Sequence, residues 1–348
     1  MDFILGPLYD LFGWLTRMFY GFFGNYGVAI IALTILIRGL LIPLNIKSQK
    51  ASIKMQALSS KQAELQRKYG DDKQKYQEEL VKLQQENGAM GMSGCLLPIL
   101  QLFFIWPIFR IVSGPLIYLS QVSKENVEAM ITLGQNLGVL GSNVVATNHI
   151  GLISVLNSNG GFLNDCIANG YMALDQMLDL HFLGIDLTMT PSINPVTIFK
   201  EPGTYLPLLI FPVLVVLTQV FSMQFAKHLK PGYKQEQEAK KRAKNNPARE
   251  GQVQENTQAE TTMKIMNWTM PLIMLYTTFI MPAAMGLYWI VGGIMGIITQ
   301  IIVYYMFTKP YELKKAEIEA KKEAIFKKKS QSDSSDDNKG KKNNKKKK

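Results

Sequence analysis

The sequence predicts an all-α polytopic membrane protein with five transmembrane helices, a cytoplasmic helical hairpin and an N-terminal interfacial helix. Three observations predict this fold class. The chain of 348 residues contains five apolar runs that are each long enough to cross a bilayer. Its formal net charge of +11 is concentrated in three of the segments that separate or follow these runs. One arginine, Arg38, interrupts the first apolar run, and a charge at that depth needs protein or water around it.

The predicted transmembrane helices cover residues 26–44, 95–119, 204–226, 264–282 and 285–307. The first contains IIALTILIRGLLIPL and is about 28 Å long at about 1.5 Å per residue, close to the hydrocarbon thickness of a bilayer. The second contains Pro98, Pro107 and Pro115, so we expect it to be kinked. A tight turn that contains MPAA joins the last two.

The distribution of lysine and arginine predicts the orientation of the chain. Residues 45–94 contain nine basic residues, residues 226–264 contain nine, and residues 308–348 contain fifteen. These segments all fall on one side of the membrane if the chain crosses it five times. By the positive-inside rule, that side is the cytoplasm, so the N-terminus lies outside and the C-terminus lies inside.

The first 25 residues are rich in aromatic side chains. They lack the basic start and the small-residue cleavage site that are typical of a signal peptide. We therefore expect residues 3–23 to form a retained helix on the outer membrane surface, with its aromatic side chains at headgroup depth. The alternative for this segment is a sixth span.

Residues 45–94 are polar but carry apolar side chains at spacings of three, four and seven residues, which indicates helix. Between two such stretches, Gly70 is a helix stop and Asp72 is a suitable N-cap for the next helix. The pattern predicts a cytoplasmic helical hairpin. It could serve as a docking element for a partner, or it could be a solvated connector.

Residues 120–203 form an outer segment that is rich in Gly, Asn and Ser, and we expect a few short helices packed on the membrane surface. His149, Cys166 and His181 are too widely separated in sequence to indicate a metal site. Cys95 and Cys166 lie on different segments, so they do not predict a disulfide framework.

The two remaining polar segments are predicted to be cytoplasmic. Residues 227–263 contain almost no apolar side chains and are expected to form a mobile loop. The tail at 308–348 begins as a charged helix and ends in SDSSDDNKGKKNNKKKK, which is predicted to be disordered. Its fifteen positive charges favour a polyanionic partner.

Four polar side chains are predicted to lie at one depth of the membrane. Counted from the cytoplasmic end of each span, Arg38, Gln101 and Gln219 lie six residues inside and Gln300 lies seven, which is about 9 to 10 Å. This layer predicts a hydrophilic pocket in the inner half of the membrane, with Arg38 as its only charge. The alternative is a set of separate interhelical hydrogen bonds, with Arg38 extending toward the cytoplasm. The outer half contains no matching layer, which argues against a continuous pore.

The last span contains Gly292 and Gly296, a small-xxx-small pair that predicts close helix packing. The sequence contains no phosphate-binding GxxxxGK[ST] loop, no HExxH zinc motif, and no serine or cysteine nucleophile with a plausible histidine. We therefore expect neither an enzyme nor a protein that depends on a cofactor or a metal.

Several segments resemble the YidC/Oxa/Alb membrane protein insertases, and in particular the bacterial YidC-type members with five spans. NYGVAIIALTILIRGLLIPL resembles the first core span of that family, with its arginine at Arg38. KMQAL, LQRKYGDDKQK and GCLLPILQ resemble the cytoplasmic hairpin and the start of the next span. FLGIDL resembles the approach to the third span, and MPAAMGLYW followed by Gln300 resembles the last hairpin. In the order of the family, these matches extend over most of residues 24–307.

The resemblance implies a groove, open to the cytoplasm and to lipid, that accepts a nascent hydrophobic segment either alone or beside the Sec translocon. It assigns the groove arginine to Arg38 and a polar partner to Gln101, and it adds Trp268 as a lining residue. The basic tail resembles tails that contact ribosomes, and anionic lipid is the competing target. The implied location is the bacterial plasma membrane.

We therefore expect an insertase and chaperone for membrane proteins, with a groove formed by Arg38, Gln101, Gln219, Gln300 and Trp268. The alternative is a small-solute or anion transporter in which Arg38 binds an anion. Such a transporter would favour a polar path to both faces and commonly an internal repeat, and neither is visible in the sequence. A scaffold subunit that chaperones other spans is a third possibility.

Overall fold

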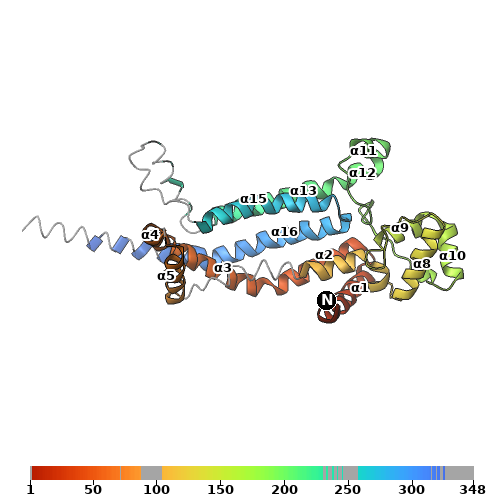
Figure 1. Cartoon of the computed structure of the whole chain (residues 1–348), viewed down its shortest axis with the longest axis horizontal. Coiled ribbons are helices and arrows are strands. Elements are labelled where there is room, and N and C mark those ends of the chain that lie inside the picture. The colour runs from red at the N-terminus through yellow and green to blue at the C-terminus, as the bar shows by residue number, and fades with distance from the viewer. Residues whose placement is uncertain are drawn as a thin grey trace, which may run out of the picture. The chain divides into compact units, whose positions relative to one another are not determined.

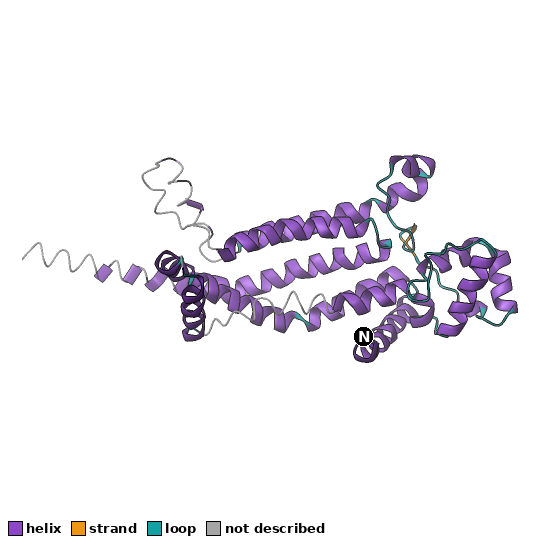
Figure 2. Cartoon of the chain, viewed as in Figure 1, coloured by secondary structure: helices purple, strands orange, loops and turns teal. Residues whose placement is uncertain are grey.

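The structure is a computed structural model that describes residues 2–70, 72–87, 104–229 and 258–314, with short pieces between 233–245 and 316–325. Apart from one short β-hairpin, these residues form helices and the turns and loops between them (Figure 2). The chain divides into two compact units. The first comprises Met1–Ala226 with Gln254–Thr299, and the second comprises Lys227–Val253 with Gln300–Lys348.

The N-terminal half of the first unit is a series of helices labelled in Figure 1. They are α1 (Asp2–Phe23), α2 (Tyr26–Leu40), α3 (Ile42–Ala57), α4 (Ser59–Tyr69) and α5 (Lys73–Glu86). Asn25 begins α2, because its side chain accepts a hydrogen bond from the backbone N–H of Val28 at 3.1 Å. Asp72 begins α5 in the same way, through the backbone N–H of Lys75 at 3.1 Å. The predicted helix stop at Gly70 and the predicted cap at Asp72 are both present.

The first predicted span is bent, not straight. Helices Tyr26–Leu40 and Ile42–Ser48 meet at an angle of 46° around Leu41. The cause is Pro43, which has no N–H to donate to the carbonyl of Gly39 and whose ring crowds the preceding turn. Arg38 therefore lies in the last turn of α2, just before the bend.

Two helices of the described chain are long and apolar enough to cross a membrane. They are Pro202–His228, which contains α12 (Pro202–Leu208) and α13 (Ile210–His228), and Ala283–Ile318, which begins with α16 (Ala283–Val303). The bent pair formed by α2 and the start of α3 adds a third if it is one span. The predicted span at 95–119 is described from residue 104 as an apolar helix, Phe104–Ser113, followed by α7 (Pro115–Tyr118). The predicted span at 264–282 overlaps α15 (Gln258–Thr278).

The outer segment folds around a substantial apolar core. Its helices are α8 (Lys124–Asn136), α9 (Ile150–Ser158), α10 (Gly160–Ala168) and α11 (Pro195–Lys200), with a 3-10 turn η1 (Leu174–Gln176). Met130, Leu152, Ile153 and Cys166 are almost fully buried among these elements. Burial raises the pKa of the Cys166 thiol to about 11, so this free cysteine remains protonated and unreactive at neutral pH.

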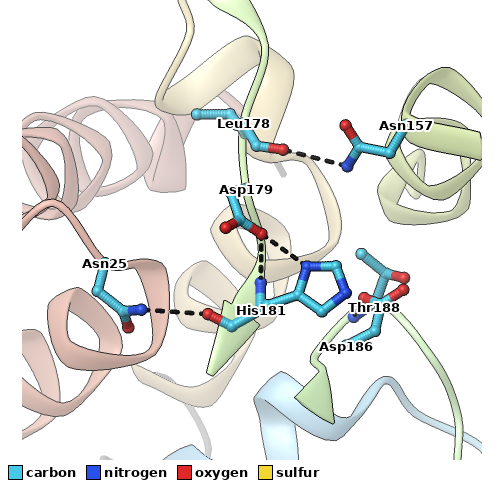
Figure 3. A network of polar contacts seen from close by, with 7 residues as sticks. All are labelled: Asn25, Asn157, Leu178, Asp179, His181, Asp186 and Thr188. Atoms are coloured by element: carbon cyan, nitrogen blue, oxygen red, sulfur yellow. Dashed lines mark hydrogen bonds and ion pairs between the residues drawn. The ribbon is translucent and has the colours of Figure 1, made fainter. Parts of the chain in front are cut away.

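A β-hairpin within the outer segment contacts α2 and α12. Its strands are β1 (His181–Phe182) and β2 (Ile185–Asp186), and β1 packs on α2 while β2 packs on α12. The Asn25 amide donates to the carbonyl of His181 at 3.1 Å (Figure 3). Just after β2, the carbonyls of Leu187 and Met189 accept from the backbone N–H groups of Ala284 at 3.2 Å and Ala283 at 2.8 Å. The hairpin therefore holds the first residues of α2 and α16 and lies beside α12.

The second unit includes a π-helix, η3 (Tyr304–Thr308), which continues from the end of α16. Beyond it, Lys321 pairs with Glu317 at 2.8 Å, as expected for residues four apart on an exposed helix. The predicted disordered end of the tail and the predicted mobile loop at 227–263 lie largely outside the described residues.

Gly27 provides a test of the packing between α2 and the hairpin. A Cβ at this position would overlap the ring of Phe182, whereas a Cβ at Gly21 would meet nothing within 4 Å. We expect Gly27→Ala to lower the free energy of unfolding by about 1 to 3 kcal/mol, because overpacking outweighs the better helix propensity of alanine. Thermal unfolding in detergent should show a lower Tm than the wild type for Gly27→Ala and an unchanged Tm for Gly21→Ala. Equal Tm values for the two variants would contradict the contact.

His149 provides a test of the outer core through pH. Its side chain is fully buried, and its Nδ1 donates to the carbonyl of Ala146 at 3.0 Å. Desolvation by burial lowers the pKa of His149 to about 4, from about 6.5 in an unfolded chain. Between these values only the unfolded chain gains a proton, so the free energy of unfolding should fall by up to about 3 kcal/mol as the pH drops from 6.5 to 4. In unfolding experiments at a series of pH values, the free energy of unfolding of His149→Leu should depend less on pH than that of the wild type. An equal dependence in both proteins would show that His149 is not its source.

Candidate functional site

Arg38 is held against the last long helix of the first unit. A Cβ at Gly292 of α16 would lie 2.8 Å from Nη2 of Arg38 and 3.3 Å from its Cζ, so the guanidinium group occupies the space that a side chain would need. The Cζ atom also lies 5.8 Å from the centre of the Tyr288 ring. Tyr288 and Gly292 are one helical turn apart on α16, so together they form one face that receives the charged group.

The Tyr288 side chain contributes a cation–π interaction. Its ring presents negative charge density to the guanidinium group of Arg38. Tyr288 is itself buried, which limits competition from water at this contact. A charge in an apolar span is costly without such contacts, so Tyr288 and Gly292 account for the position of Arg38.

Gln219 approaches the same level of α16 from another helix. A Cβ at Gly293 would lie 3.2 Å from Oγ1 of Thr218 and 3.8 Å from Nε2 of Gln219, both on α13. Gly292 and Gly293 are consecutive, so Arg38 and Gln219 reach α16 at one level, from α2 and α13 respectively. Thr218 Oγ1 also donates to the carbonyl of Leu214 at 2.8 Å, which holds its side chain along α13.

The other three predicted site residues are Gln101, Gln300 and Trp268. Gln101 lies outside the described residues. Gln300 belongs to the second compact unit, and its depth relative to Arg38 stays a prediction. Trp268 is 57% exposed and lies on the same face of α15 as Ile265, Leu272 and Tyr276, which are also exposed, whereas Met274 packs against the core. Its role in lining a groove also stays a prediction.

The charge of Arg38 has no carboxylate partner within the described part of the chain. The ion pairs there include Lys82 with Glu79, Lys124 with Glu128, His181 with Asp179, and Lys321 with Glu317, and none of them involves Arg38. Arg38 instead contacts an aromatic ring and a glycine, and it is only half-buried. Its positive charge can therefore still attract an anionic group.

The sequence did not identify Tyr288, Thr218 or Gly293 as site residues. An aromatic residue one turn before a glycine on the same helix was the available signal, but which helix would face it could not be read from spacing. The observed packing at Gly292 also differs from the predicted close contact between helices at Gly292 and Gly296. Gly292 faces the Arg38 side chain, and a Cβ at Gly296 would meet no described atom within 4 Å.

Polar groups of the outer segment form a separate network around β1 (Figure 3). Asp179 accepts from the backbone N–H of His181 at 2.9 Å and pairs with His181 Nδ1 at 2.6 Å, and the backbone bond is the main reason that its pKa is lowered. Asn157 donates to the carbonyl of Leu178 at 3.3 Å. These contacts fix the start of the hairpin. In the described residues, no group of three His, Cys, Asp or Glu side chains is arranged to hold a metal ion.

Comparison with known proteins identifies relatives over a short segment. The chain is 45% identical over 60 residues to membrane protein insertase YidC 2 of Streptococcus pyogenes serotype M3, and 40% identical over 60 residues to that of Streptococcus agalactiae serotype V. Each alignment covers 17% of this chain and 19% of the relative, so it spans about one fifth of the relative's length.

A family model extends the similarity to most of the chain. The model of the 60Kd inner membrane protein matches residues 18–310, a range that includes Arg38, Gln219, Tyr288 and Gly292. The long apolar helices are consistent with the membrane-integral proteins that this description implies. The chain therefore belongs to the 60Kd inner membrane protein family, the family of YidC and Oxa proteins.

Proposed function

We propose that the chain is a membrane protein insertase and chaperone of the bacterial plasma membrane. In this proposal it accepts nascent transmembrane segments in a hydrophilic groove that opens to the cytoplasm and to lipid. Family membership and the name of the streptococcal relatives support the assignment. The single observation that carries the mechanism is the guanidinium group of Arg38, held by Tyr288 and Gly292 and without a carboxylate partner in the described residues.

The proposed mechanism uses the charge of Arg38 to lower the barrier for polar substrate residues. An acidic side chain in the outer tail of a substrate would form a charge-assisted hydrogen bond with Arg38, stronger there than in water because the dielectric is low. Gln219 would offer a neutral polar contact at the same level of α16. Burial of the apolar substrate segment in lipid would then drive its release, so no ATP hydrolysis by this chain is required.

Five spans with an outer N-terminus and a cytoplasmic C-terminus remain part of the proposal. The first, third and fifth proposed spans begin with α2, α12 and α16, and each begins beside the β-hairpin. These three helices therefore run in the same direction, as alternation across five spans requires. In this arrangement α4 and α5, which contact each other, would form the cytoplasmic hairpin.

The proposed partners are nascent membrane proteins, the ribosome, the Sec translocon and anionic lipid. The fifteen basic residues of 308–348 favour phosphate groups, which both ribosomal RNA and anionic lipid present. A small-solute or anion transporter is the second candidate, because the charge of Arg38, which has no carboxylate partner among the described residues, would bind an anion. Photo-crosslinking from position 38 to ribosome-bound nascent chains separates the two, since a transporter would capture none.

The first functional prediction concerns Arg38 itself. Arg38→Ala should reduce insertion of a single-span substrate with an acidic outer tail by about tenfold, if the charge-assisted bond contributes about 1.5 kcal/mol. Arg38→Lys should retain more activity, because the charge remains. Insertion into reconstituted vesicles, with a substrate whose tail acids are replaced by amides as the control, measures the effect. Equal insertion by wild type and Arg38→Ala would remove Arg38 from the mechanism.

The second functional prediction uses the two glycines of α16. Gly292→Ala should push the Arg38 guanidinium away and reduce insertion of the acidic-tail substrate severalfold. Gly296→Ala is the matched control, since its Cβ meets no described atom within 4 Å and alanine favours helix. Both variants should be tested in the same vesicle assay, with their thermal unfolding as a check on folding. Loss of insertion in Gly296→Ala alone would refute the proposed role of Gly292.

A further inference from the structure

The outer segment carries a row of exposed apolar side chains immediately before a membrane-crossing helix. Ile193, Val196 and Phe199 are 75%, 61% and 83% exposed, respectively. They are spaced three residues apart. Ile193 lies just before the N-cap of α11, and Val196 and Phe199 lie on one side of the helix. Single exposed apolar side chains are common on protein surfaces, but several of them side by side mark a contact surface.

This row is not needed to fold α11. The helix begins with Pro195, and the Asn194 side chain caps it by accepting from the backbone N–H of Val196 at 3.0 Å. It packs on α12. Ile198 is only partly exposed and lies about 200° around α11 from Val196. None of the three row residues belongs to the apolar core found in the described residues.

The length of the adjoining span places this row at the membrane surface. Pro202–His228 has 27 residues, or about 40 Å of helix, whereas the hydrocarbon core of a bilayer is about 30 Å thick. About 5 Å at each end therefore extends into the headgroup region. Phe199 is three residues before Pro202, so chain connectivity keeps it within about 10 Å of that depth.

The surroundings of the row match an interfacial contact. Lys200 is exposed and follows Phe199 directly, at the edge of the same face, where its ammonium group can reach lipid phosphate while its stem stays with apolar atoms. The exposed residues of the adjoining helix, Leu206, Ile210, Val213 and Leu217, continue as a lipid-facing stripe at helical spacing. Apolar contact is thus continuous from the span to α11.

We propose that Ile193, Val196 and Phe199 insert into the headgroup region of the membrane leaflet from which α12 enters, with Lys200 at the phosphate level. The contact anchors the outer segment to the bilayer at α11, so that the β-hairpin beside α12 is held at a fixed height. This inference requires only that Pro202–His228 crosses the membrane. It does not depend on the insertase activity or on Arg38.

Site-directed spin labelling in vesicles of phosphatidylethanolamine and phosphatidylglycerol tests the proposal. Labels are attached to Phe199→Cys and to Val196→Cys in the full chain, with Cys95 and Cys166 replaced by alanine. Leu137→Cys is the matched control, because Leu137 is an exposed apolar residue at the end of α8 that does not adjoin a span. Collisions with oxygen, which concentrates in lipid, are compared with collisions with a water-soluble nickel complex.

The expected result is that oxygen collisions exceed nickel collisions at positions 196 and 199, and that the order is reversed at position 137. Nickel collisions exceeding oxygen collisions at position 199 would overturn the proposal, because the row would then face water. Dipolar broadening between labels at position 199 would also overturn it, because a second copy of the chain would cover the row. The thermal unfolding of each labelled variant confirms that the labelled protein is folded.

Discussion

The constraint on which the structure depends is the placement of one permanent positive charge inside an apolar helix. Arginine cannot be neutralised in a protein, so Arg38 must find contacts that replace water. Gly292 supplies space on α16, and Tyr288 supplies the face of its aromatic ring. Neither neutralises the charge, and since no carboxylate in the described part of the chain pairs with Arg38, the site can still attract an anion.

The geometry of this contact depends on the β-hairpin, beside which α2 and α16 both begin. The β-hairpin holds the first residues of α2 through Asn25 and the first residues of α16 through Ala283 and Ala284. Arg38 lies about 18 Å along α2 from Tyr26, and Gly292 lies about 14 Å along α16 from Ala283. With both helices starting at the hairpin and running in the same direction, the long arginine side chain can cover the remaining offset. The hairpin thereby sets the register in which the charged group meets the glycine.

The outer segment has a physical role of its own in this arrangement. Its buried core, built by α8, α9 and α10, gives the hairpin a rigid support, as the contact between Asn157 and the carbonyl of Leu178 illustrates. The apolar row on α11 supplies a second support at the membrane surface. A hairpin held from both sides can keep the first residues of α2 and α16 together.

The sequence by itself determined the features that depend on local chemistry. Apolar periodicity identified the helices, Gly70 and Asp72 marked a helix boundary, and the cost of a buried charge singled out Arg38. The tertiary structure decided which side chains meet. The sequence did not predict the bend at Leu41, although Pro43 is present there, and the ring and glycine around Arg38 come from a helix some 250 residues away in the chain. The fold of the outer segment was also invisible in its composition, because its core joins residues that no local pattern relates. Residue spacing shows which side chains share one face of a helix. A site also depends on which helix packs against that face, and only the tertiary structure decides this.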